Sequence, residues 1–185
     1  VITGFGRLTT PFATDYFDVE PDMMTTAKGL TNGTIPMGAV FSKKFIHDTF
    51  MEAPAGIELF HGYTYTGHPV ACAASLATLE VFKEQKLLDH AKEIQPYWED
   101  AVHSLKGLPH VIDIRTIGLV AGIELAPRPG APGARAYAAF KKAFADGLLI
   151  RTTGDIIALS PPLTFEKKHI DELFGKLGKV LQDLD

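Results

Sequence analysis

Residues 1–83 contain too few strand-like segments to enclose a hydrophobic core of their own. Val1–Thr3 is typical of the end of a strand, and Met37–Phe41 is a short apolar run that predicts a buried strand. The longest loop, Ala53–Thr66, is rich in Pro, Gly and aromatic residues. A sheet face or helix stripe that is apolar must be buried against another layer. We therefore expect residues 1–83 to depend on further chain or on a partner subunit.

Residues 84–185 show a different pattern, which predicts a compact α+β unit with its own sheet and helices. Apolar residues alternate or cluster in four short segments that we expect to be strands. Three other segments carry apolar residues at helical spacing, and Thr164 can cap the last of them. The predicted strands are Val111–Arg115, Leu119–Leu125, Leu148–Thr152 and Ile156–Leu159.

Composition and charge exclude several function classes. The 185 residues carry a formal net charge of −4, whereas proteins that bind nucleic acid usually carry a positive excess. No segment reaches the roughly 18 unbroken apolar residues that a membrane span needs. The single cysteine, Cys72, allows neither an internal disulfide nor a zinc site of several thiolates, and it fits a reducing, cytoplasmic location. The seven histidines are scattered, so we expect no metal site.

Lys28 stands among small neutral residues in the segment Thr25–Gly33. A lysine held in confined, apolar surroundings loses stabilisation of its ammonium form. The free amine can then attack a carbonyl and form a Schiff base. The same pattern also fits a lysine whose stem lies along apolar surface at a strand end. The residues alone leave both interpretations open.

Two further segments each allow a functional and a structural interpretation. Tyr63 and Thr64 lie in His61–Pro69, just before a predicted helix, where hydroxyls and free N–H groups suit a phosphate. The alternative is a capped helix with an aromatic-lined turn. Arg151 follows an apolar strand, and its guanidinium is suited to a substrate carboxylate. The alternative is an internal ion pair with an acid such as Asp155.

Together these segments resemble the class III aminotransferases, which are pyridoxal-phosphate enzymes of fold type I. The resemblance is strongest to the ω-amino acid or β-alanine:pyruvate aminotransferases, and it spans nearly the whole chain. Several separate blocks in the right order are far more specific than any one of them. The blocks are Val1–Arg7, Pro21–Asp22, Ala27–Gly33, Pro36–Val40, His61–Ala74, Val111–Arg115, Gly118–Leu119 and Ser160–Leu163.

The resemblance implies a fold of mixed class, α/β followed by α+β. Residues 1–83 would be the C-terminal part of the large, cofactor-binding domain, a mixed sheet with helices. Residues 84–185 would be the small C-terminal α+β domain. We accordingly expect the chain to be the back part of a longer protein.

The resemblance also implies roles for individual residues. Lys28 matches the lysine that forms a Schiff base with pyridoxal 5'-phosphate and later moves the proton. Val1 matches the residue that packs against the pyridine ring. Thr64, with Tyr63 beside it, matches the threonine that reaches across a dimer interface to the cofactor phosphate of the other subunit. Arg151 matches the arginine that binds a substrate carboxylate and can swing aside for an uncharged substrate.

The implied reaction is a ping-pong transfer of an amino group from an amine or ω-amino acid to a keto acid such as pyruvate, in a homodimer or higher oligomer. The sequence departs from the family at one important point. The aspartate that pairs with the pyridine nitrogen would lie two residues before Val1, so we expect the chain alone to be inactive. Two alternatives stay open. They are an aminomutase or decarboxylase of the same fold, and a truncated, non-catalytic dimerisation module.

Overall fold

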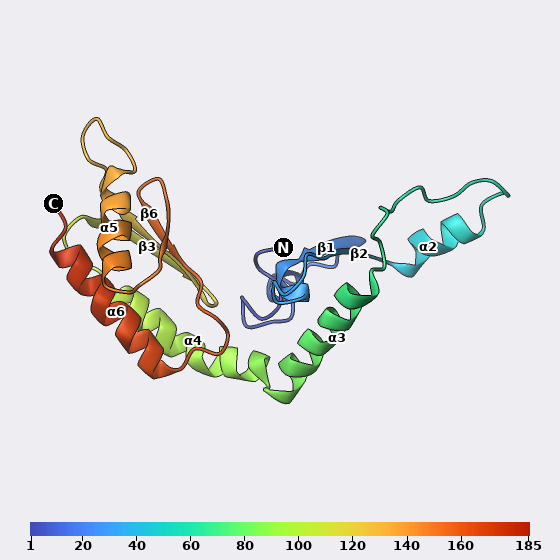
Figure 1. The fold of residues 1–185 in the computed structure, drawn as a ribbon, viewed down its shortest axis with the longest axis horizontal. Coiled ribbons are helices and arrows are strands. Elements are labelled where there is room, and N and C mark those ends of the chain that lie inside the picture. The colour runs from blue at the N-terminus through green and yellow to red at the C-terminus, as the bar shows by residue number, and fades with distance from the viewer. The chain divides into compact units, whose positions relative to one another are not determined.

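The computed structural model describes all residues, 1–185, and they form two compact units (Figure 1). The first unit comprises Val1–Gly6 and Thr10–Leu87, and the second comprises Arg7–Thr9 and Leu88–Asp185. The division lies just past residue 83, at the start of a helix. The assignment of the two units to the large and small domains of a family stays a prediction.

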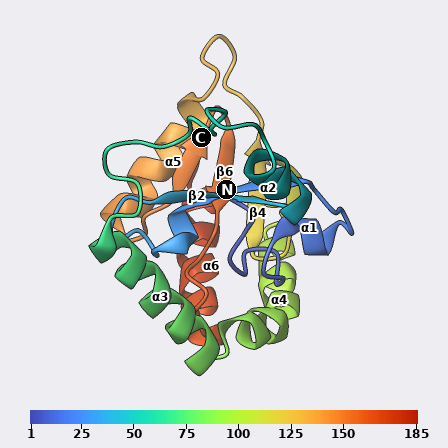
Figure 2. The same cartoon turned by 90° about the vertical axis from the view of Figure 1, so that its right-hand side faces the viewer.

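The first unit contains a two-stranded antiparallel hairpin whose register runs from Met23 opposite Ser42 to Ala27 opposite Gly38. Three helices and one 3-10 turn accompany it. In Figure 2 a long loop leads from α2 to α3. The elements are α1 (Ala13–Tyr16), β1 (Met23–Ala27), η1 (Lys28–Leu30), β2 (Gly38–Ser42), α2 (Lys44–Met51) and α3 (Pro69–Glu84).

Two expectations for the first unit are wrong. Val1–Thr3 forms no strand. The apolar run from Met37 does form a strand, β2, but that strand is not buried, since Val40 is 45% and Phe41 49% exposed. The physical reason is that a lone hairpin has no second layer within this unit against which to bury its faces.

The second unit contains a four-stranded antiparallel sheet with the strand order β3-β4-β6-β5. Three helices complete it. A strand forms in each of the four expected segments, but the one expected at Leu148–Thr152 begins only at Arg151 and ends at Thr153. The last helix begins after Glu166 rather than at Thr164. The elements are α4 (Leu87–His103), β3 (Val111–Ile117), β4 (Val120–Leu125), α5 (Ala134–Ala145), β5 (Arg151–Thr153), β6 (Ile156–Leu159) and α6 (Lys167–Gln182).

The core of the second unit lies between one face of the sheet and the three helices. Along β4, buried residues alternate with partly exposed ones, as expected for a strand with one covered face. The buried face of β4 packs into one cluster with α4, α5 and α6. Trp98 of α4 is fully buried there, and its ring lies edge-on to Phe174 of α6 at a centroid distance of 5.4 Å.

Two negative findings bear on function. None of the helices combines the length and the apolar character required for crossing a membrane. No group of three or more His, Cys, Asp or Glu side chains is arranged to hold a metal ion.

Candidate functional site

Lys28 lies where β1 ends and the chain enters the turn η1. Its φ of 52° is in the left-handed region, which few residues other than glycine adopt. The Lys28 carbonyl accepts hydrogen bonds from the N–H groups of Thr31 (3.4 Å) and Gly33 (3.2 Å), and these bonds close the turn. Residues held in sparsely populated backbone conformations cluster at functional sites. Six other non-glycine residues of the chain, Lys86 among them, also have a positive φ, so the conformation alone does not distinguish Lys28 as functional.

The glycine after Lys28 is required by a close approach of Phe5. A Cβ on Gly29 would lie 2.7 Å from the Cδ2 atom of the Phe5 ring, which is well inside contact distance. The Phe5 ring packs edge-on to Phe12 and Phe82, at centroid distances of 5.5 and 6.4 Å. The turn that carries Lys28 thus rests on an aromatic cluster.

The confined, apolar surroundings expected for Lys28 are not present within the first unit. The residue is exposed and takes part in none of the ion pairs of the chain. The reason is again that the hairpin carries no covering layer. The Lys28 side chain consequently has no partner within the chain. Val1 is half exposed, in a stretch without regular structure.

Tyr63 and Thr64 lie in the exposed loop before α3. The Tyr63 N–H donates to Oγ1 of Thr66 (2.7 Å), and the Tyr63 carbonyl accepts from the Thr66 N–H (2.9 Å). These two bonds close a turn with Thr64 inside it. Tyr63 is 83% exposed, and its ring lies edge-on to His61 at a centroid distance of 6.2 Å.

The N-terminus of α3 follows this turn directly. Pro69 is at its first position, and the N-cap residue His68 provides no side-chain hydrogen bond. The first N–H groups of a helix have no partner within the helix, and they carry the positive end of its dipole. An anion such as a phosphate is the group that this end of α3 suits.

Arg151 lies at the start of β5, the edge strand of the second unit's sheet, and pairs with Ala158 of β6. Its side chain is exposed and forms no ion pair. Asp155, the alternative partner, instead accepts a hydrogen bond from the Gly133 N–H through Oδ2 (2.6 Å). The internal Arg151–Asp155 pair is therefore not formed, and the guanidinium is free for a carboxylate from outside the chain.

Arg151 borders a surface hollow of about 620 Å³ in the second unit. Thr152 and Ser160 contribute polar atoms to it, and most of the other lining residues are apolar or aromatic. A guanidinium at the rim of an apolar hollow is suited to a ligand with a carboxylate on an apolar body. The aromatic side chains that line the hollow are Tyr137, Phe140 and Phe165.

These aromatic residues are not among the site residues expected from the sequence. Tyr137 and Phe140 lie in a segment whose apolar spacing predicts a helix. Their rings are stacked at a centroid distance of 6.0 Å. Tyr137 is 56% exposed, whereas Phe140 is partly buried against the core. One feature of the sequence could have indicated the hollow. Ser160–Leu163, a block of the family resemblance, lies only nine residues after Arg151.

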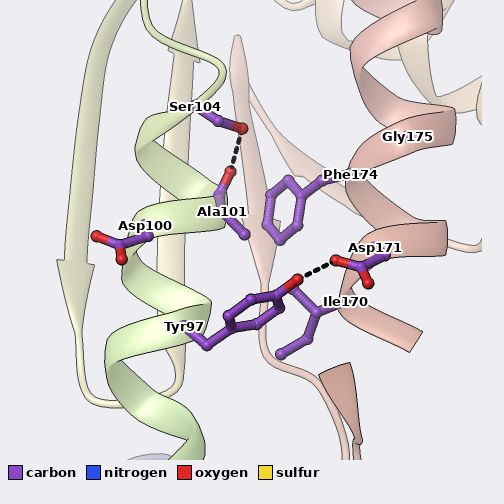
Figure 3. A pocket seen from close by; sticks show the side chains of 8 residues that line it. All are labelled: Tyr97, Asp100, Ala101, Ser104, Ile170, Asp171, Phe174 and Gly175. Carbon is purple, nitrogen blue, oxygen red and sulfur yellow. Dashed lines mark hydrogen bonds between the residues drawn. The ribbon is translucent and has the colours of Figure 1, made fainter. Parts of the chain in front are cut away.

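A second hollow, of about 450 Å³, lies between α4 and α6 and contains none of the predicted site residues (Figure 3). The Tyr97 hydroxyl donates a hydrogen bond to Asp171 across it. This bond and the negative charge of Asp171 raise the pKa of Tyr97 above its usual value. Since the bond ties α6 to α4, its role is structural.

The predicted site residues divide between the two units. Val1, Lys28, Tyr63 and Thr64 belong to the first, whereas Arg151 belongs to the second. The first unit thus contains the lysine and the candidate phosphate contacts. The second unit contains the candidate carboxylate-binding arginine.

Comparisons with known proteins agree on one family. The model of the aminotransferase class-III family matches residues 1–181. The whole chain is 57% identical to an omega-aminotransferase of Caulobacter vibrioides and 42% identical to a beta-alanine–pyruvate aminotransferase of Pseudomonas aeruginosa, and covers 42% of each. A solved structure of an (S)-enantioselective omega-transaminase from Thermomicrobium roseum matches with a TM-score of 0.90 at 32% identity, over 99% of this chain and 42% of the other.

These matches define the fold as part of a pyridoxal-phosphate-dependent transferase, of the mixed helix-and-sheet class that the sequence predicted. The chain belongs to the class III aminotransferase family. It spans about two fifths of the length of the relatives it matches.

Pyridoxal phosphate is the cofactor of this family, and the residues of the first unit fit part of what that group requires. An aldehyde needs an amino group without a competing partner, and the Lys28 side chain is exposed and forms no ion pair. A phosphate needs N–H donors and hydroxyls, and the start of α3 with Thr64 in the preceding turn offers both. The fit is partial because the chain offers no acid placed for the pyridine nitrogen among these residues.

Proposed function

We propose that this chain is the C-terminal part of an enzyme that transfers the amino group of an ω-amino acid or amine to pyruvate. The observation that carries the proposal is the exposed, unpaired side chain of Lys28, held on a turn inside a segment that matches the class III family. The names of the relatives from Caulobacter vibrioides and Pseudomonas aeruginosa support the choice of amine and acceptor.

Lys28 is proposed as the catalytic residue. Pyridoxal phosphate, when bound, supplies an aldehyde for the amino group and a ring that accepts electrons from the substrate carbon. The Nζ atom of Lys28 would hold the cofactor through its aldehyde carbon when no substrate is present. Once substrate has displaced it, the same nitrogen would be the base that takes a proton from the substrate carbon bearing the amino group.

Val1, Tyr63 and Thr64 are proposed to bind the cofactor. Val1 offers an apolar side chain for one face of the pyridine ring. The Thr64 hydroxyl and the N–H groups at the start of α3 offer donors for the phosphate, and Tyr63 offers an aromatic wall beside them. The Thr64 contact is proposed to reach the cofactor of a second subunit.

Arg151 is proposed to bind the substrate carboxylate through two parallel N–H donors. No ion pair within the chain has to be broken before Arg151 binds a substrate. The residue lies on the short edge strand β5, so its side chain has room to move away. Movement of the guanidinium would leave the apolar wall of the hollow for an uncharged substrate. One site would then accept both ω-amino acids and simple amines.

A homodimer, or a higher oligomer of dimers, is proposed for the complete enzyme. The long loop before α3 exposes apolar residues that a monomer would have no reason to present to water. A partner subunit would cover them and at the same time receive Thr64. We place the enzyme in the cytoplasm, in keeping with its single cysteine, Cys72. The exposed loop residues are Ile57, Leu59, Phe60, Tyr63 and Tyr65.

Residues 1–185 alone are proposed to be inactive, because they span two fifths of the length of the relatives. The remaining three fifths would supply the acid for the pyridine nitrogen and the rest of the substrate pocket. Turnover of β-alanine and pyruvate by the isolated chain would overturn this proposal.

Borohydride reduction in the presence of pyridoxal phosphate tests the proposal directly. In the full-length protein we expect one stable adduct, and peptide mass mapping should place it on Lys28. The variant Lys28→Ala should lose the adduct. Lys44→Ala is a matched control, because Lys44 is an exposed lysine of the same unit that is paired with Asp48. Labelling spread over surface lysines, with Lys28 unmodified, would contradict the proposal.

A product assay separates transamination from the other chemistries of the same fold. Transamination of β-alanine with pyruvate forms alanine, whereas decarboxylation releases CO₂ and an aminomutase leaves the amino group on the same molecule. Light scattering after size exclusion, with and without cofactor, separates the non-catalytic alternative. A stable dimer that takes up no cofactor would favour a dimerisation module over an enzyme.

A further inference from the structure

Arg7–Thr9 is a short segment that belongs to the second unit, although the residues on both sides of it belong to the first. Leu8 is fully buried, and the Leu119 N–H donates to the Arg7 carbonyl at 2.9 Å. Gly118 leaves room for the segment. A Cβ on Gly118 would lie 2.5 Å from the Cα of Leu8, and its φ of +54° also favours glycine. The position of Arg7 is therefore tightly fixed.

The guanidinium of Arg7 is half buried and has no anionic partner. Its Nη1 donates to the carbonyl of Pro161 (2.5 Å) and to the carbonyl of Leu119 (3.4 Å). No carboxylate lies within ion-pair distance, and burial lowers the pKa of Arg7 from its usual value. A cation bound only to neutral carbonyls costs desolvation that a structural arginine usually offsets with an acid. Arg135 is likewise buried without a side-chain acid partner, so what distinguishes Arg7 is which carbonyl it binds.

Pro161 connects Arg7 to the candidate carboxylate site. The segment Ser160–Pro162 follows β6 directly and lines the same hollow as Arg151. Arg151 is held in register by Ala158, two residues before this segment. Proline has no N–H, so Pro161 can be fixed by hydrogen bonding only through its carbonyl. Arg7 is the group that binds that carbonyl.

We propose that Arg7 is a positioning residue, which holds the Pro161 carbonyl and so sets part of the wall of the hollow that Arg151 also lines. The proposal rests on the role proposed above for Arg151. If the wall shifts, a carboxylate bound by Arg151 loses its fit, whereas an amine without a carboxylate uses only the apolar surface. Arg7 is thus expected to determine the preference for carboxylated amines.

The test is a comparison of two amino donors in the full-length enzyme, β-alanine with a carboxylate and propylamine without one. In Arg7→Lys, which keeps the charge but not the planar fork, we expect KM for β-alanine to rise by about tenfold. We expect KM for propylamine and both kcat values to stay within about twofold. If Arg7→Lys is not stably folded, Arg7→Gln, which keeps an N–H donor, takes its place.

Arg135→Lys is the matched control. Arg135 is also a buried arginine that donates to backbone carbonyls, those of Ala126 and Asp185, but it does not line the hollow. We expect it to lower the melting temperature without changing the ratio of the two KM values. Hydrogen exchange gives a second readout: the amides of Leu159, Ser160 and 163–165 should exchange faster in Arg7→Lys and normally in Arg135→Lys.

The outcomes distinguish a failure of the role proposed for Arg7 from a failure of the carboxylate role proposed for Arg151. Equal changes for both donors, or no change with normal exchange, would overturn the positioning role of Arg7. Arg151→Ala must abolish the discrimination between donors. If it does so while Arg7→Lys behaves like the wild type, only the role of Arg7 fails. If Arg151→Ala leaves the discrimination unchanged, the carboxylate role of Arg151 is wrong and this inference falls with it.

Discussion

The two units of the chain differ sharply in how they bury apolar side chains. In the second unit, one cluster joins the covered face of the sheet to three helices. In the first unit the buried hydrophobic residues are Leu30, Ala71 and Leu87. Most of the exposed large hydrophobic side chains also belong to the first unit. Only four belong to the second: Ile112, Tyr137, Phe144 and Leu149.

This difference shows that the unit with the proposed cofactor residues is the one that cannot stabilise itself. Burying a leucine stabilises a fold by about 1.5–3 kcal/mol, whereas fixing the backbone of each residue costs about 1–2 kcal/mol. A few buried side chains cannot offset the ordering of so long a segment. The site that holds Lys28 must therefore gain its stability from chain outside residues 1–185 or from a second subunit.

The largest expected effect is a difference in thermal unfolding between the two units when each is produced as a separate fragment. A fragment of residues 88–185 should unfold in a single cooperative transition on heating, because it contains almost the entire core. A fragment of residues 1–87 should show no such transition. Circular dichroism as a function of temperature measures both. A sigmoidal transition in fragment 1–87 would contradict the proposal that the first unit needs further chain or a second subunit in order to fold.

The next effect comes from truncating one aromatic residue in each unit of the 185-residue chain. Trp98→Ala should destabilise the chain by about 3–5 kcal/mol, because Trp98 is fully buried in the core of the second unit. Phe60→Ala should change the free energy of unfolding by less than about 0.5 kcal/mol, since Phe60 is 90% exposed. Urea titration followed by circular dichroism measures both. A loss of several kcal/mol in Phe60→Ala would mean that the loop is already covered.

The same difference explains how much the sequence could predict. In the second unit the strand at Ile156–Leu159 was predicted with its observed bounds, because local alternation and burial agree there. In the first unit the apolar run at Met37–Phe41 predicted burial that the chain does not provide. A hydrophobic pattern reports the environment of the complete fold, so it misleads where part of that fold lies outside the sequence.

The site was predictable where it depends on residue type and sequence block, as for Lys28 and Arg151. It was not predictable where it depends on shape. The left-handed turn at Lys28 and the aromatic lining beside Arg151 follow from tertiary contacts that no local pattern encodes. Arg7 was quoted only as part of a family block, because nothing in the sequence shows that its partner is the carbonyl of Pro161, 154 positions away.

A smaller effect should follow from adding a methyl group at a glycine of each unit. Gly118→Ala places the methyl against the backbone of buried Leu8 at a positive φ, and should lower stability by about 1–3 kcal/mol. Gly29→Ala also meets a close neighbour, but Phe5 lies in the unit that contributes little to the unfolding transition. We expect its melting temperature to match that of the wild type. Differential scanning calorimetry measures both.

Gly107→Ala controls for the positive φ alone, because its φ is +86° and a Cβ there would meet nothing within 4 Å. It should cost less than Gly118→Ala, and the difference isolates the clash with Leu8. A lower melting temperature in Gly29→Ala than in Gly118→Ala would show that the first unit melts together with the second and contributes to the same unfolding transition.

The smallest expected effect concerns two equivalent ion pairs, Lys44–Asp48 on α2 and Glu172–Lys176 on α6. In the folded chain the lysine of each pair lowers the pKa of its carboxyl group. A lowered carboxyl pKa contributes stability above the unfolded pKa of about 4, and that contribution is lost as the pH falls through the folded pKa. The α6 pair also has the better order, with the acid N-terminal to the base.

Carbon-detected NMR titration of the isolated 185-residue chain can follow both carboxyl groups. Because α6 packs on a complete core, we expect the pKa of Glu172 to be lowered and to return towards its usual value in Lys176→Gln. Because α2 belongs to the unit that lacks a core, we expect the pKa of Asp48 to be close to that of an unfolded peptide, with or without Lys44. A lowered pKa of Asp48 that Lys44→Gln restores would mean that α2 is folded in the isolated chain. The first unit would then be more stable in the isolated chain than its few buried residues imply.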